Sequence, residues 1–236
     1  MKKNCFYTIV LEHILSLIST GELMPGDKLP SERALCSALD QNRNTVRHAL
    51  LLLQREGKIF RLERKGWYLT PTRLVYNPAN HINFARLAES QGRKAHWTTI
   101  DNGIVHASNL TDTGGDEGFP SGTPVYEMDN VFSLDGLKVA CVKNYIHAER
   151  LPGIIPKTAH TGMTQVAEEQ YSTPLIQRRL LIRPLLLPKF VTTELSITPG
   201  SPGVYVRRIK TDSNSVVLTV EHEYWRFDAI ELRVDQ

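Results

Sequence analysis

The stretch from Leu29 to Leu69 reads LPSERALCSALDQNRNTVRHALLLLQREGKIFRLERKGWYL, and it decides the fold of the first part of the chain. Ser31 is placed to cap a short helix, and the polar run Asp40-Gln41-Asn42 favours a tight turn after it. A second, longer helix is expected to run as far as Gly57, where a glycine can end it. Two short helices joined by a tight turn are typical of a helix-turn-helix, which places the start of its second helix in the DNA major groove.

The second predicted helix has an apolar side and a polar side. Its apolar residues recur at i, i+3, i+4 and i+7, as expected for the buried stripe of a helix: Val46, Ala49, Leu50 and Leu53. Arg43, Asn44, Thr45 and Arg47 lie at its exposed start or on the opposite side. Arginine can bind guanine edges with two hydrogen bonds, asparagine can bind adenine, and threonine suits a phosphate or a thymine methyl. A merely solvated polar face would look the same, so this helix alone does not decide between the two.

The residues after Gly57 predict a basic hairpin. Lys58–Leu62 reads as a strand, Glu63–Gly66 as a turn and Trp67–Thr70 as a returning strand. Such a hairpin directly after a helix-turn-helix is a wing. We expect its tip, Arg64, Lys65 and Gly66, to lie against a phosphate backbone or in the minor groove.

The charge is unevenly distributed along the chain, whose net charge is +3. Residues 1–75 contain 12 Lys and Arg against 7 Asp and Glu, whereas residues 76–236 contain 16 against 18. A basic first third joined to a mildly acidic remainder favours a nucleic-acid-binding module followed by a domain that does not bind nucleic acid. The hydrophobic and charged fractions, 41% and 22%, are those of a folded globular protein.

Cysteine usage and hydropathy indicate the cellular compartment in which the protein is expected. Cys5, Cys36 and Cys141 are odd in number, far apart and without metal-ligand spacing, which favours a reducing, cytoplasmic environment and no metal site. No continuous apolar run suggests a signal peptide or a membrane span. We therefore expect no membrane partner and no cofactor.

Two domains are expected, with an α+β fold overall. A helix within Phe6–Ser19 precedes the helix-turn-helix, so the DNA-binding domain covers residues 1–70, and the Pro-containing residues 71–80 resemble a linker. Residues 81–236 open with a helix at Asn83–Gln91 and continue as short strands separated by turn signals, with helices near Thr164–Tyr171 and Pro188–Leu195. The strands are predicted at Thr98–Ala107, Val125–Leu134, Leu137–Ile146, Leu180–Leu187, Val204–Thr211 and Val216–Trp225. Strands joined mostly by hairpins predict an antiparallel sheet.

The N-terminal residues resemble the winged helix of the GntR regulators. The shared pattern includes Gly21-x-Leu-x-Pro-Gly-Asp-x-Leu-Pro-Ser-Glu-Arg33, then Asn42-Arg-Asn-Thr-Val-Arg47, then Gly66-Trp-Tyr68. In that family the residues corresponding to Arg33, Arg43, Thr45, Arg47 and Gly66 approach DNA. Combined with the polar face and the wing, the candidate DNA-binding residues are Ser31, Arg33, Arg43, Asn44, Thr45, Arg47, Arg64, Lys65 and Gly66.

The remainder resembles the UTRA effector domain of the HutC branch of that family. The matching features include Asp135-Gly136 in a hairpin, Tyr171-Ser-Thr-Pro174, Pro199-Gly-Ser-Pro202 and the closing Glu223-Tyr-Trp-Arg226-x-Asp228. The wing and this closing motif look closest to regulators of 2-aminoethylphosphonate use. The resemblance implies a sheet similar to that of chorismate lyase and a small, usually anionic effector held against it.

The resemblance also suggests effector-binding residues, with one departure from the family pattern. Where relatives carry two arginines and a Glu around the hairpin, this chain is expected to have Asn130, Phe132 and Lys143. Lys143 could supply a point charge with help from Arg178, Arg207 or Arg208, of which the last two are adjacent on a strand and cannot both face one pocket. Glu221 could bind an ammonium group or pair structurally with Arg226. The candidate effector-binding residues are Phe84, Lys143, Tyr145, Arg207, Glu221, Tyr224 and Arg226.

Three classes of function remain to be compared. The favoured one is a homodimeric transcriptional regulator, a repressor, that binds a palindromic operator and is released by a small anionic or zwitterionic metabolite such as 2-aminoethylphosphonate. A sugar phosphate or an amino-acid catabolite is the alternative effector. A chorismate-lyase-like enzyme is disfavoured because no catalytic motif is present. A DNA-binding protein without an effector is disfavoured because the second domain is of full domain size.

Overall fold

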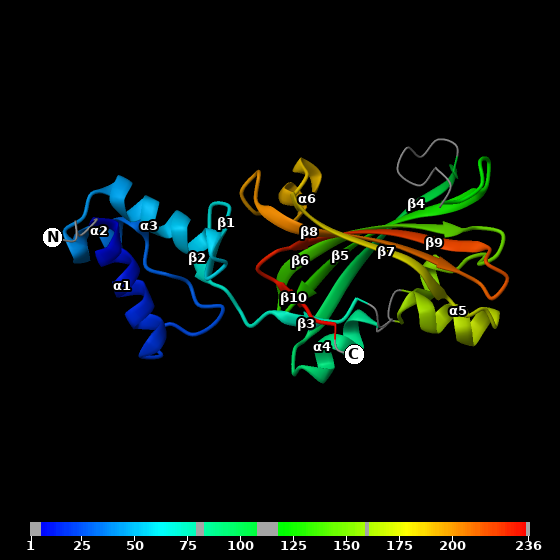
Figure 1. The fold of residues 1–236 in the computed structure, drawn as a ribbon, viewed down its shortest axis with the longest axis horizontal. Coiled ribbons are helices and arrows are strands. Elements are labelled where there is room, and N and C mark those ends of the chain that lie inside the picture. The colour runs from blue at the N-terminus through cyan, green and yellow to red at the C-terminus, as the bar shows by residue number, and fades with distance from the viewer. Residues whose placement is uncertain (1–5, 79–82, 108–117, 159–160, 235–236) are drawn as a thin grey trace.

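A computed structural model describes residues 6–78, 83–107, 118–158 and 161–234, which form two lobes (Figure 1). The first lobe contains the helices α1 (Phe6–Ser19), α2 (Glu32–Leu39) and α3 (Arg43–Arg55), followed by the strands β1 (Ile59–Leu62) and β2 (Gly66–Leu69). Its core contains the predicted apolar stripe of α3 packed against Val10, Ile14 and Leu35. The predicted winged helix-turn-helix is confirmed.

Side-chain caps begin both helices of the helix-turn-helix. The Ser31 hydroxyl accepts a hydrogen bond from the Ala34 amide at 3.1 Å, and the Asn42 carboxamide oxygen accepts one from the Thr45 amide at 2.9 Å. Asp40 ends α2 in a left-handed conformation, with φ 48°. These caps pair amide groups that a helix start leaves without partners, so they fix where α3 begins.

The wing is a short antiparallel pair in which Ile59 lies opposite Leu69 and Leu62 lies opposite Gly66. Its turn needs left-handed backbone at Arg64 (φ 60°) and at Gly66 (φ 105°), and glycine adopts such a conformation without strain. The other side of β2 is paired with the segment before α2, since the Leu29 amide donates to the Trp67 carbonyl and the Leu69 amide donates to the Asp27 carbonyl.

The second lobe is built on a six-stranded antiparallel sheet with the order β4-β5-β6-β9-β8-β7. Its strands are β4 (Ala95–His106), β5 (Pro124–Leu134), β6 (Leu137–His147), β7 (Ile176–Leu186), β8 (Pro202–Thr211) and β9 (Val217–Arg226). We call the face covered by α4 (Phe84–Ser90) and α5 (Met163–Tyr171) the inner face; α6 (Lys189–Glu194) covers part of the outer face (Figure 1). A 3-10 helix at Ile155–Thr158 precedes α5. The predicted α+β architecture is confirmed.

The region predicted as a linker contains a strand. Residues Leu74–Tyr76 form β3, which pairs in parallel with β10 (Ile230–Leu232) near the far end of the described chain. Leu74 and Tyr76 are buried in the same cluster as Trp225. The predicted linker over residues 71–80 thus includes a strand that was not predicted, because a three-residue strand with a distant parallel partner leaves no periodic signal.

The wing contacts the second lobe directly. The Glu63 amide donates to the Ser196 carbonyl at 2.9 Å, and Leu62 forms an isolated bridge with Ile197. The Arg226 guanidinium lies 4.1 Å from the Phe60 ring centroid. The free edge of β1 is thus covered by the segment after α6, and the two lobes are joined by more than the connecting chain.

No helix in the described ranges combines the length and the apolar character needed to cross a membrane.

Candidate functional site

The first candidate site is the exposed start of α3 together with the wing tip. Arg43, Asn44 and Arg47 are exposed, as are Arg33 on α2 and both Arg64 and Lys65 on the wing turn. The remaining three predicted residues have local structural roles as well. Ser31 caps α2, Thr45 donates its hydroxyl to the Asn42 carboxamide at 3.2 Å, and Gly66 forms the wing turn. The caps leave the charged and amide side chains of α3 directed away from the core.

Glu32 connects the three elements of this surface. Its carboxylate accepts hydrogen bonds from Arg43 Nε on α3 at 3.4 Å and from Trp67 Nε1 on the wing at 3.2 Å. Burial alone would raise the pKa of Glu32, but the hydrogen bonds from Trp67 and Arg43 and the nearby positive charge of Arg61 lower it overall. Glu32 therefore stays ionised and holds α2, α3 and β2 in one arrangement.

The second candidate site is a cavity of about 150 Å³ on the inner face of the sheet, beside α4 and the start of α5. One wall is aromatic, because Phe84 of α4 stacks on Phe132 of β5 at 4.5 Å between centroids, and Trp225 lies against both rings. Trp97 of β4 also lines the cavity. A small cavity with an aromatic wall and a few convergent polar groups is the usual form of a metabolite site.

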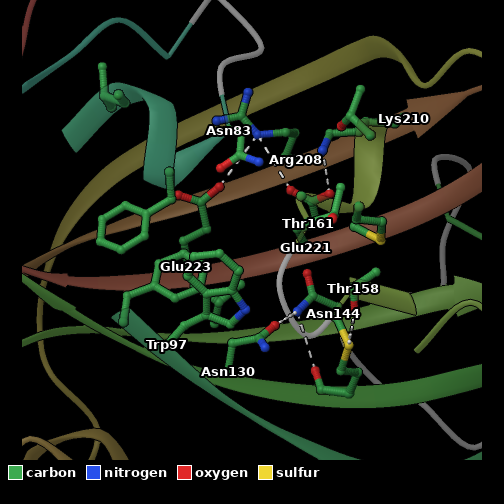
Figure 2. A pocket seen from close by; sticks show the side chains of 18 of the residues that line it. Asn83, Trp97, Asn130, Asn144, Thr158, Thr161, Arg208, Lys210, Glu221 and Glu223 are labelled. Atoms are coloured by element: carbon green, nitrogen blue, oxygen red, sulfur yellow. Dashed lines mark hydrogen bonds and ion pairs between the residues drawn. The ribbon is translucent and has the colours of Figure 1, made fainter. Parts of the chain in front are cut away.

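Four charged side chains line the cavity from two neighbouring strands. Arg208 and Lys210 come from β8, and Glu221 and Glu223 come from β9 (Figure 2). Arg208 Nε lies 3.4 Å from a Glu223 oxygen and 3.6 Å from a Glu221 oxygen, and Lys210 pairs with Glu221. Burial raises the pKa of Glu223 and lowers that of Lys210, since each loses water around its charged form.

Amide side chains form a second polar group, from β5 and β6. The Asn144 amide nitrogen donates to the Asn130 carboxamide oxygen at 2.9 Å, and the Asn130 amide nitrogen donates to the Thr99 hydroxyl at 2.8 Å. Asn83 reaches the cavity from the cap of α4 (Figure 2). A Cβ atom at Gly162 would lie 2.3 Å from the Asn83 amide nitrogen, so a larger residue there would displace the Asn83 side chain.

Comparison with known proteins identifies the family. Residues 6–69 match the description "Bacterial regulatory proteins, gntR family", and residues 90–231 match the "UTRA domain". The chain belongs to the gntR family. The uncharacterized HTH-type transcriptional regulator YihL of Escherichia coli K12 is 32% identical over 92% of each chain. The HTH-type transcriptional repressor NagR of Bacillus subtilis is 24% identical, covering 94% of this chain and 90% of its own. The gntR family is regulatory, which excludes the enzyme alternative.

The fold is shared with solved gntR-family structures. PhnF from Mycobacterium smegmatis superposes with a TM-score of 0.65, covering 96% of this chain and 98% of its own, at 20% sequence identity. At that identity the likeness concerns the fold. The chain is thus a gntR-family transcriptional regulator with a DNA-binding winged helix and a UTRA domain.

The cavity of this gntR-family protein contains only two of the seven predicted effector-binding residues, Phe84 and Glu221. Lys143, Tyr145, Arg207 and Tyr224 lie on the outer face: in the strand register Lys143 and Arg207 both face His222, Tyr145 faces Val220, and Tyr224 faces Cys141. Neighbouring strand residues point to opposite faces of the sheet. Each of the four predicted residues therefore points away from the cavity, while the residue next to it in the strand points towards the inner face. Of the adjacent arginines, Arg208 faces the cavity.

Arg226 also lies outside the cavity. It pairs with Asp228 and not with Glu221, the partner considered from the sequence. Its Nη2 atom is 2.6 Å from an Asp228 oxygen, and its guanidinium contacts the wing at Phe60. Glu221 instead pairs with Lys210 and Arg208. Asn130 and Phe132, at which the sequence was expected to depart from the family pattern, face the cavity.

Residue-based reasoning named Arg208 only as a possible helper of Lys143, and it missed Lys210, Glu223, Asn144, Trp97 and Tyr76 as cavity residues. The period of two along β9 was a usable signal, since it places Glu221, Glu223 and Trp225 on one face and excludes Tyr224 and Arg226 from it. Which residues of β8 share that face depends on the register between strands, and the sequence does not contain this directly.

Proposed function

We propose that this protein is a homodimeric transcriptional repressor that binds a palindromic operator and is released by a small polar metabolite. The observation that carries this is the combination, in one chain, of an exposed Arg43-Asn44-Arg47 surface at the start of α3 with a cavity in the UTRA domain that is lined by aromatic and charged side chains. The first suits base edges in the major groove, and the second suits a small ligand. As a dimer, the protein would place two such helices on two half-sites.

Within the proposed DNA contact, the nine candidate residues have different tasks. Arg43, Asn44 and Arg47 would read base edges, whereas Arg33 and the wing residues Arg64 and Lys65 would bind phosphates. Ser31 would donate its hydroxyl group to a phosphate oxygen, and Thr45, whose hydroxyl donates to Asn42, would place its methyl group against a thymine methyl. Gly66 would permit close approach of the wing backbone.

The proposed dimer contact lies along β7, an edge strand of the sheet. Exposed apolar side chains are concentrated on it and on the adjoining α6: Ile176, Leu181, Ile182, Leu186 and Phe190. An exposed apolar edge strand is a surface that a soluble protein normally covers. A second copy of the chain would cover both its apolar side chains and its unpaired backbone groups.

The proposed effector binds in the inner-face cavity. The classes expected from the sequence, namely anionic or zwitterionic metabolites such as 2-aminoethylphosphonate, sugar phosphates and amino-acid catabolites, are the first compounds to test. Release requires that the ligand bind the DNA-free geometry more tightly than the DNA-bound one.

A direct route connects the proposed ligand site to the wing. Trp225 forms part of the cavity wall, and the next residue of β9, Arg226, contacts Phe60 of β1. A ligand that shifts β9 at Trp225 would therefore alter the packing of the wing. We propose that this contact transmits occupancy of the cavity to the spacing of the two α3 helices.

Substitution of single arginines tests the DNA-binding part. Arg43→Ala and Arg47→Ala should each weaken binding to an operator obtained by selection from random DNA by about 30-fold or more, since a bidentate base contact contributes roughly 1–3 kcal/mol and is lost in both half-sites. Arg55→Ala, at the exposed far end of the same helix, should bind like the wild type. Unchanged affinity in both test variants would contradict the proposed reading surface.

A further inference from the structure

The fixed charges of the cavity balance. Among its described lining residues, two carry positive charge, Arg208 and Lys210, and two carry negative charge, Glu221 and Glu223. All four are buried, with 2%, 2%, 6% and 6% of their surface exposed. These described side chains therefore give the cavity no excess positive charge with which to attract an anion.

The Arg208 guanidinium is already committed to protein partners. Its Nε faces the two carboxylates, and its Nη1 donates to the Pro78 carbonyl at 2.9 Å and to the Gln177 carboxamide. Its Nη2 donates to the Tyr76 hydroxyl. Within the described part of the chain, one N–H of Nη2 is left without a partner. A bidentate grip on a phosphate or phosphonate needs two parallel N–H groups, so Arg208 would have to give up contacts that hold β3 to the sheet.

An anionic ligand would also leave uncompensated charge beside side chains that are themselves buried. A phosphoryl group carries about −1.5 to −2 charges at neutral pH. Burial of charge without a counter-charge is strongly unfavourable. Asn130 and Phe132 face the cavity from β5, and both side chains are uncharged. The balance of charges at this site thus selects against a net negative ligand.

What the cavity offers instead is hydrogen bonding of both kinds beside an apolar wall. Asn144 uses its amide nitrogen on Asn130 and on the Met128 carbonyl, so its carboxamide oxygen is left to accept. Asn83 uses its oxygen on the Ala85 amide, so its nitrogen is left to donate. A hydroxyl group donates and accepts, and it can therefore satisfy both. The carbon face of a ring could rest on the aromatic wall of Phe84, Phe132 and Trp97.

We infer that the effector of this protein is an uncharged, hydroxyl-rich small molecule of the sugar or polyol class, bound without a phosphate or phosphonate group. This inference rests on the proposed function, because it names the ligand of the same cavity. It names an effector class that the sequence resemblance did not suggest, in place of the charged metabolites expected from it.

Thermal unfolding of the full chain tests the inference. The panel consists of uncharged pentoses, hexoses, aminohexose N-acetyl derivatives and polyols, each beside its phosphorylated counterpart, with 2-aminoethylphosphonate and inorganic phosphate added. We expect at least one uncharged compound to raise Tm by about 5–10 °C at a concentration near 100 times its Kd, and its phosphorylated counterpart to raise it far less. Stabilisation by the charged compounds alone, or by no uncharged compound, overturns the inference. Operator binding by the same protein is measured separately. It tests the proposed function, whether or not an uncharged compound stabilises the protein.

Two variants locate the effect in the cavity. Glu221→Gln leaves one excess positive charge there and should shift preference towards the phosphorylated counterpart by at least about 10-fold, roughly the effect of 1.4 kcal/mol. Glu127→Gln, the same change on the outer face, should leave the preference unaltered. Asn144→Leu removes the free acceptor without introducing charge, and it should lower affinity for the uncharged compound by at least about 10-fold. If Asn144→Leu binds this compound as the wild type does, or if a folded Glu221→Gln keeps the wild-type preference, the inference is wrong.

Discussion

At the scale of single residues, Glu32 links α3 to the wing through hydrogen bonds from Arg43 and Trp67. Glu32→Gln should lower the free energy of unfolding at pH 7 by about 1 kcal/mol, because hydrogen bonds to a charged group weaken and solvent already screens the pair. The folded pKa of Glu32 is lowered, so its stabilisation is present above the unfolded value near 4.5 and is lost as pH falls through the folded value. Denaturant unfolding at pH 7 and at acid pH checks both statements.

Glu56 provides the control for that experiment. It pairs with Lys58, and both side chains are about half exposed. Glu56→Gln should change stability by less than about 0.5 kcal/mol. A Glu32→Gln difference that persists unchanged below the folded pKa would contradict the assigned role of the ionised carboxylate.

The buried pair Lys210–Glu221 yields a second prediction at this scale. Lys210→Met should destabilise the protein by about 3–5 kcal/mol, because Glu221 then loses its closest cation in a dry site. Lys210→Met combined with Glu221→Leu should recover most of that loss, while Glu223 continues to neutralise Arg208. A double-mutant cycle by denaturant unfolding measures the coupling. Additive losses would show that the two side chains do not act as a pair.

Residue types alone predicted which side chains are exposed at the start of α3 better than they predicted which side chains line the cavity. Arg43, Asn44 and Arg47 are neighbours at one helix start, so their exposure follows from one helical period. The cavity combines Phe84, Asn130 and Arg208 from three elements far apart in sequence. Their convergence depends on strand register, because a shift of one residue along a strand moves a side chain to the other face of the sheet. Arg207 illustrates this, since it lies on the outer face while its neighbour Arg208 faces the cavity.

At the scale of elements, the chain order of helices and strands was predictable because caps, glycines and apolar periods mark most boundaries. The strand β3 was not, and neither was the contact of the wing with the segment after α6. Both are made by short pieces whose partners lie more than a hundred residues away. Local sequence reports local structure, and these pairings exist only after the sheet has formed.

The wing contact leads to a prediction of its own. Leu62→Ala should lower stability by about 1 kcal/mol, less than for a fully buried leucine, because Leu62 is partly exposed in the cluster with Leu195 and Ile197. It should also speed hydrogen exchange at the Glu63 amide, which donates to Ser196 across the lobes. Hydrogen exchange measured by NMR is the readout. Leu51→Ala, at an exposed site on α3, should leave that amide protected.

At the scale of the whole molecule, the proposed dimer predicts an effect of β7 on DNA binding. Leu181→Asp should convert the protein to monomers and weaken operator binding by at least about 10-fold, since two linked half-site contacts become one. Ile100→Asp is the matched control, because Ile100 is exposed on β4, the opposite edge of the sheet. Sedimentation measures the oligomeric state of each variant, and operator titration measures its affinity for DNA. A Leu181→Asp protein that remains dimeric would place the interface elsewhere.

The parallel pairing of β3 with β10 has a consequence for how the protein is made. Residues 6–69 form a complete core of their own, so the winged helix can fold while the ribosome is still translating the rest. The strand β3 leaves the ribosome next but must wait for β10, and Glu221, Glu223 and Trp225 of the cavity are also translated late. A growing chain therefore acquires its DNA-binding surface long before its ligand cavity, and synthesis must reach Leu232 before β3 has its partner.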